Sequence, residues 1–191
     1  VAPYRLMTHF MLALIIIGYT VWLWLDLGGE RRFKTSRLLS VLSIALLALV
    51  SIQMASGALV AGLDAGRTYT DWPLMDGAFV PASYIQEGLG IRSLFEGLAA
   101  TQFNHRVLGY VLWGAALGGA MLAWGKPAAK PFALLATLVT AQAAWGIYTL
   151  VSGAPLELAI IHQALGVIVF IAAVRLVWIT RSPQELQSAT S

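Results

Sequence analysis

The sequence predicts an all-α, polytopic membrane protein, and two observations support that prediction. Of its 191 residues, 59% are hydrophobic and only 11% are charged, whereas soluble domains carry about 25% charged residues. Five apolar stretches also approach the roughly 20 residues that a helix needs to cross a bilayer. They cover residues 5–25, 38–62, 104–124, 132–152 and 157–180. We therefore expect five transmembrane helices, one helix followed by a four-helix bundle.

Basic residues indicate how these helices are oriented. A turn signal at residues 26–30 ends the first stretch, and four basic residues follow it: Arg31, Arg32, Lys34 and Arg37. Short loops rich in Lys and Arg stay in the cytoplasm. The later basic residues fall on the same side: Lys126, Lys130, Arg175 and Arg181. This pattern places the N-terminus outside and the C-terminus inside. It accounts for the formal charge of +3 without nucleic acid as a partner.

Loop 63–103 is too long for a simple connection and belongs on the outer side, because its acidic residues outnumber its basic ones. Its aromatic residues and glycines favour an ordered cap on the membrane surface, with a short amphipathic helix at 92–101. An ordinary interfacial loop with an aromatic belt is the alternative.

The three histidines, His9, His105 and His162, all lie within roughly 8 Å of the outer membrane boundary, counting 1.5 Å per helical residue. Two imidazoles that face each other inside a four-helix bundle suit a six-coordinate haem. The alternative is that each histidine makes an interhelical hydrogen bond. The sequence has no cysteine, which excludes thiolate metal sites, and a zinc site lacks a third ligand at this depth.

Two further features accompany the histidines. Gln53-x-x-x-Gly57 recurs as Gln142-x-x-x-Gly146, and its glycines would let a flat ligand approach a helix closely; helix packing is the alternative. Arg106 follows His105 on the outer side, where a guanidinium could pair with a haem propionate. Snorkelling to the interface is the alternative for Arg106.

A repeat relates the first and last stretches. Ala2-Pro3-x-x-Leu6 precedes His9 just as Ala154-Pro155-x-x-Leu158 precedes His162. The first stretch therefore looks like the last helix of an earlier four-helix unit, so we expect a fragment with helices missing before it, and no signal peptide at Val1. The expected divisions are residues 1–26 (last helix of the N-terminal bundle), 27–37 (cytoplasmic linker), 38–181 (C-terminal bundle) and 182–191 (cytoplasmic tail).

Several motifs together resemble the haem A synthase family, over nearly the whole chain. They are Pro3-Tyr4-Arg5-Leu6-x-x-His9, Gln53-x-x-x-Gly57-x-x-Val60-x-Gly62-Leu63-Asp64-Ala65-Gly66, Trp72-Pro73-Leu74-Met75, Gln102-Phe103-x-His105-Arg106, Ser152-Gly153-Ala154-Pro155 and His162-Gln163. The resemblance implies eight helices in two pseudo-twofold halves, each with a histidine pair. This chain would hold the last helix of the first half and all of the second.

By this resemblance, His105 and His162 would ligate the iron of a prosthetic haem b, and His9 would be a catalytic residue that ligates the iron of the substrate, haem O. The reaction would oxidise the C8 methyl group of haem O to the formyl group of haem A, for cytochrome c oxidase biogenesis. Haem b would relay electrons from an electron donor. The expected location is the bacterial cytoplasmic membrane or the mitochondrial inner membrane.

The resemblance also implies limits. The second histidine of the N-terminal half, and the acidic residue before it, are absent, so this segment alone would be an incomplete enzyme. Gln102 stands at the place of that acidic residue in the second half, which suits an electron-transfer site. Haem O synthase is the expected supplier of haem O, and a homo-oligomer is left open. The alternatives are a membrane b-type cytochrome without haem-modifying activity and a cofactor-free assembly protein.

Overall fold

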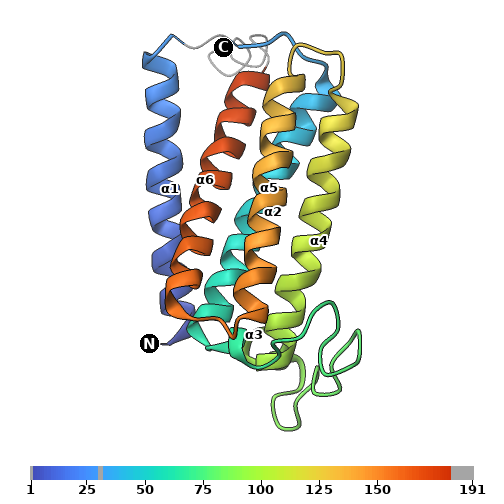
Figure 1. Ribbon diagram of the computed structural model, residues 1–191. Helices are drawn as coiled ribbons and strands as arrows, with labels where there is room; N and C mark the ends of the chain where they lie inside the picture. The colour runs from blue at the N-terminus through green and yellow to red at the C-terminus, as the bar shows by residue number, and fades with distance from the viewer. Residues whose placement is uncertain (1, 30–31, 182–191) are drawn as a thin grey trace.

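The computed structural model describes residues 2–29 and 32–181, and it is all-α. Five long helices lie side by side (Figure 1): α1 (Pro3–Leu27), α2 (Arg37–Gly62), α4 (Leu98–Leu122), α5 (Ala129–Val151) and α6 (Leu156–Thr180). Three short elements lie between α2 and α4: η1 (Ala65–Arg67), η2 (Gly90–Arg92) and α3 (Ser93–Glu96). The expected tail at 182–191 and part of the expected linker lie outside the described residues.

Within the described ranges, four helices are long and apolar enough to cross a membrane: α1, α2, α5 and α6. The protein is therefore a multi-pass membrane protein. The fifth helix, α4, has 25 residues, as many as α1 and α6, but it does not join this set. Its first turns contain Gln102, Asn104, His105 and Arg106, which lower its hydropathy. The five-span prediction is thus confirmed for four helices and stays a prediction for α4.

Four of the long helices form a ring. Around this ring α2 packs against α4, α4 against α5, α5 against α6, and α6 against α2, so α4 and α6 lie diagonally opposite each other. Helix α1 packs against α2 and α6 from outside the ring, at the edge of the molecule in Figure 1. The predicted arrangement of one helix plus a four-helix bundle is what the structure contains.

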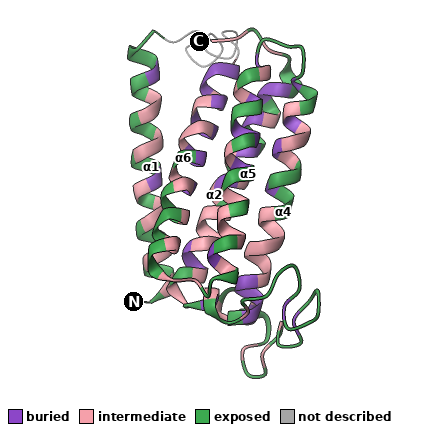
Figure 2. Ribbon diagram, viewed as in Figure 1, coloured by how far each residue is buried: buried purple, intermediate pink, exposed green. Residues whose placement is uncertain are grey.

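The buried core occupies the half of the bundle away from the loop between α2 and α4. Its largest fully buried side chains there include Leu39, Leu46, Phe132, Leu135 and Ile179. Nearer that loop, four segments at one level contain no buried residue at all (Figure 2). They are residues 51–57 of α2, 103–111 of α4, 140–148 of α5 and 156–165 of α6. All four helices of the ring therefore change from tight to partial burial at a common level.

The loop between α2 and α4, residues 63–97, is called the cap below. A single helix was predicted at 92–101, but the structure does not contain it. Instead, α3 ends at Glu96, and Gly97 has an extended backbone (φ −80°, ψ 128°). Helix α4 then begins at Leu98, six residues before the predicted start. The prediction of a single helix at 92–101 was wrong because Gly97 breaks it, and the prediction for α4 missed its polar first turns.

Side chains from these first turns hold the cap in place. The amide nitrogen of Gln102 donates to the carbonyl oxygens of Tyr69 (2.8 Å) and Gly66 (3.3 Å). Asn104 donates to the carbonyl of Leu94 (3.2 Å) and accepts a bond from the hydroxyl of Tyr84 (2.9 Å). These bonds satisfy backbone groups of an irregular segment, which explains how the cap is ordered without a strand or long helix of its own.

Candidate functional site

His105 lies on α4, in contact with two residues of α2. A methyl group added at Gly57 would lie only 3.1 Å from Cε1 of His105, so the imidazole rests directly on the backbone of α2. The side-chain nitrogen of Gln53 donates to the backbone carbonyl of His105 (3.1 Å). It also lies 3.2 Å from Nδ1 and 3.3 Å from Nε2 of the ring. The Gln53-x-x-x-Gly57 motif therefore contacts both the ring and the backbone of one histidine.

His162 lies on α6 in a similar relation to α5. A methyl group added at Gly146 would lie 2.6 Å from Cε1 of His162, closer than side-chain carbons come in practice. The side-chain nitrogen of Gln142 donates to the backbone carbonyl of His162 (2.9 Å). The two Gln-x-x-x-Gly motifs thus make the same two contacts in the two helix pairs, one with a histidine carbonyl and one with an imidazole ring. The flat group that lies against each glycine in this structure is an imidazole ring.

The two histidines lie on diagonal helices of the bundle, His105 on α4 and His162 on α6. Both lie within the level where the ring helices have no buried residue. In the described part of the chain, Oε1 of Gln53, Oε1 of Gln142 and Nδ1 of His162 are buried without hydrogen-bond partners. A buried polar atom without a partner costs about 1–3 kcal/mol, so these three atoms lower the stability of the bundle.

This donor set fits a haem. Two imidazoles from opposite sides of a four-helix bundle are the axial ligands that a six-coordinate haem uses. The glycines let each imidazole sit close to the neighbouring helix, and none of the four segments contains a fully buried residue. The chemistry of the ligands and the packing around them therefore agree.

His9 does not join the other two histidines. It lies on the exposed face of α1, together with the exposed side chains of Leu12, Ile16 and Tyr19. These positions recur every three or four residues and form one stripe that faces away from α2 and α6. Most of the outer face of α1 is exposed in Figure 2. His9 therefore lies outside the ring of four helices, on the face of α1 that does not contact them.

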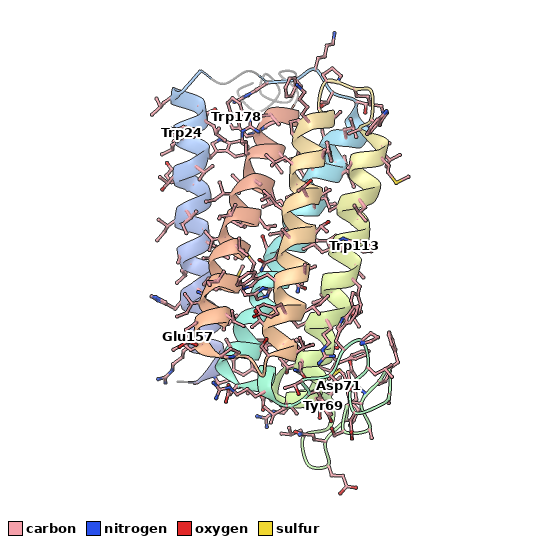
Figure 3. The ribbon with its side chains drawn as sticks, in the orientation of Figure 1. Trp24, Tyr69, Asp71, Trp113, Glu157 and Trp178 are labelled. Carbon is pink, nitrogen blue, oxygen red and sulfur yellow. The ribbon has the colours of Figure 1, made fainter. Side chains whose placement is uncertain are left out.

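Arg106 contacts the cap. Its guanidinium donates to the carbonyl oxygens of Tyr69 (2.9 Å), Asp71 (2.9 Å) and Leu74 (3.1 Å). Figure 3 labels Tyr69 and Asp71, which lie beside the first turns of α4. The predicted pairing of Arg106 with a propionate stays a prediction, since the contacts observed here are with the cap. A guanidinium suits this task because its five N–H groups fan out in one plane.

Two site residues went unnoticed in the sequence. Gly109 and Gly166 each lie four residues after a histidine, on the same helix face. A methyl group at Gly109 would lie 3.4 Å from the side-chain nitrogen of Gln53, and one at Gly166 would lie 3.3 Å from that of Gln142. Each glycine thus leaves room for the glutamine to reach the histidine carbonyl. The repeated His-x-x-x-Gly spacing was the available signal.

The sequence that forms this site is similar to a known protein family. Residues 1–174 match the family model COX15-CtaA, described as cytochrome oxidase assembly protein. The chain belongs to this family. The match includes both histidines of the ring, both Gln-x-x-x-Gly motifs and α1 with His9. The resemblance seen in the sequence is therefore confirmed at the level of the family.

Curated relatives agree. The chain is 55% identical to a haem A synthase of Hyphomonas neptunium, over 97% of this chain and 53% of that protein. It is 40% identical to a haem A synthase of Maricaulis maris, over 95% of this chain and 54% of that protein. The chain thus spans about half the length of these curated relatives. No solved structure matches it.

Proposed function

We propose that this chain is the haem b-binding part of a haem A synthase, which oxidises the C8 methyl group of haem O to the formyl group of haem A. The observation that supports the cofactor best is the common level in the bundle. There His105 and His162 lie on diagonal helices, and each rests on a glycine of a neighbouring helix. The reaction class comes from the relatives, which are haem A synthases.

In this proposal His105 and His162 would hold the iron of haem b. When bound, haem b supplies one-electron transfer, which an oxidation of haem O requires. The chain's own residues would position the ligands. Gln53 and Gln142 hold the histidine backbones, while Arg106 and Gln102 hold the cap over the end of α4.

His9 would serve the substrate. It projects from the exposed stripe of α1, which in a protein of twice this length would be covered by the other half. We propose that residues 1–26 are the last helix of that half and that His9 ligates the iron of haem O there as a catalytic residue. Haem O synthase would supply the substrate, and the product would serve cytochrome c oxidase biogenesis.

The membrane arrangement follows from the same proposal. All five long helices would cross a bacterial cytoplasmic or mitochondrial inner membrane, with α4 tolerated because its polar residues face the cap and the bundle interior. The cap would lie outside and the basic linker 27–37 inside, as the positive-inside rule requires. Residues 38–181 would form one bundle around haem b.

The test uses the full-length protein with His105→Ala, His162→Ala or His9→Ala. A reduced-minus-oxidised spectrum should lose its six-coordinate b-type signal in the first two variants and keep it in the third. His9→Ala should instead abolish conversion of haem O to haem A. A b-type signal that survives loss of His105 or His162 would refute the assignment of ligands.

The same experiment separates the second candidate, a membrane b-type cytochrome that only carries electrons. Such a carrier needs neither His9 nor α1, and its extracted pigment would contain haem b alone. Haem O or haem A among the extracted pigments, as measured by pyridine haemochrome analysis, would favour the synthase. A folded full-length protein without any haem would exclude both.

A further inference from the structure

The ring of four helices is built from two equivalent helix pairs, α2 with α4 and α5 with α6. In each pair one helix carries Gln-x-x-x-Gly and the other His-x-x-x-Gly. The glutamine donates to the histidine carbonyl, the first glycine supports the imidazole, and the second glycine leaves room for the amide. We call each arrangement a clip. A helix carbonyl has two lone pairs and normally uses one within its helix, so it can accept this second bond.

The two clips differ at the imidazole ring. The side-chain nitrogen of Gln53 is nearly equidistant from the two ring nitrogens of His105 (3.2 and 3.3 Å). An approach in the ring plane at equal distances would collide with Cε1, which lies between these atoms, so the amide must lie over the ring face. Among the described residues, Gln142 bonds only to the carbonyl of His162, and Nδ1 of His162 has no partner.

We infer that Gln53 is a positioning residue that fixes the plane of the His105 imidazole, whereas Gln142 positions the backbone of His162 and leaves its ring plane less constrained. The side-chain nitrogen of Gln53 donates to the His105 carbonyl, and the same nitrogen lies over the imidazole ring. It therefore resists rotation of that ring about its bond to Cβ. This inference rests on the proposed ligation of haem b by these two histidines.

The plane of an axial imidazole has a measurable consequence. The angle between two axial imidazole planes sets how unevenly the ligands act on the d orbitals of a low-spin ferric iron. That unevenness determines the g-values in electron paramagnetic resonance, while the axial ligands also influence the reduction potential. A residue that fixes one plane therefore affects both quantities without touching the haem.

The experiment compares Gln53→Leu with Gln142→Leu in the full-length protein. Both substitutions remove the same bond to a histidine carbonyl, so Gln142→Leu is a matched control for lost backbone anchoring. Gln53→Leu should shift and broaden the g-values of the oxidised b-type signal by more than the linewidth and shift its midpoint potential. Gln142→Leu should shift the g-values less than Gln53→Leu does, because it removes only the bond to a histidine carbonyl. Gln53→Met, which fills similar volume without a donor, should repeat the effect of Gln53→Leu.

The outcomes distinguish a failure of the proposed function from a failure of the positioning role of Gln53. If wild-type protein contains no b-type haem, the proposed function fails and this inference fails with it. If wild-type protein contains haem b but Gln53→Leu and Gln53→Met give unchanged g-values, only the positioning role fails. Equal shifts in the Gln53 and Gln142 variants would also overturn it. Folded Gln53 variants that cannot retain haem would overturn it too, since fixing a plane is not required for coordination.

Discussion

Replacing Gly146 by Ala is the most direct test of how the histidines are held. The new methyl group would lie 2.6 Å from Cε1 of His162, whereas carbon atoms in contact lie about 3.5–4.0 Å apart. The ring or the helix must therefore move by about 1 Å. The same change at Gly57 starts from 3.1 Å and requires only about 0.4 Å.

These displacements predict an order of effects. Overpacking of this kind costs about 1–3 kcal/mol, and an active-site group must stay within about 0.5 Å of its working position. Without haem the imidazole can turn aside, so the cost falls on haem binding. Gly146→Ala should weaken haem binding by roughly 5- to 150-fold, and Gly57→Ala should weaken it less.

Titration of the haem-free full-length protein with haem measures this affinity. Gly114→Ala on α4 is the control, because a methyl group there would meet nothing within 4 Å. It should bind haem as the wild type does. Wild-type affinity in Gly146→Ala, or an equal loss in Gly114→Ala, would refute the close-packing argument.

Two further predictions concern the cap and the contact between α1 and α6. Arg106→Gln removes bonds from a charged donor to three cap carbonyls, so amide exchange in the cap should speed up by roughly 30-fold, equivalent to about 2 kcal/mol. Arg92→Gln breaks only an exposed pair with its own helix turn and should leave exchange near the wild-type rate; equal rates in both variants would contradict the role of Arg106. Asp26 accepts bonds from Trp178 (2.7 Å) and Arg32 (2.8 Å), and Asp26→Ala should lower stability by about 1–2 kcal/mol in thermal unfolding in detergent. Asp26→Asn, which keeps an acceptor, should lose less, and an unchanged midpoint in Asp26→Ala would show that this contact is not stabilising.

The helices were predictable because their apolar runs are long and their ends carry clear signals. Ser36 before α2 is an N-cap whose side chain accepts a bond from the backbone of Leu39, and the turn after α1 begins at Gly28. Helix α4 was harder to delimit. Gln102 was assigned to the predicted loop 63–103, yet it belongs to the first turns of α4 and donates to the cap.

The sequence indicated most of the candidate site residues, but not Gly109 and Gly166, and not the contacts that these residues make. Spacing alone related His105 and His162 to the two Gln-x-x-x-Gly motifs. It could not show that Gly57 and Gly146 support imidazole rings, because that depends on which helices are neighbours in the bundle. Arg106 shows the same limit: a guanidinium near a histidine suits a propionate, and only the folded cap shows three carbonyls within its reach.

The division of the ring into two clips has a mechanical consequence. Each imidazole rests on a glycine of its own helix pair, so this support does not depend on the distance between the pairs. Substitutions where α2 meets α6, or where α4 meets α5, would therefore alter the distance between the two helix pairs. They would leave each imidazole on the glycine that supports it.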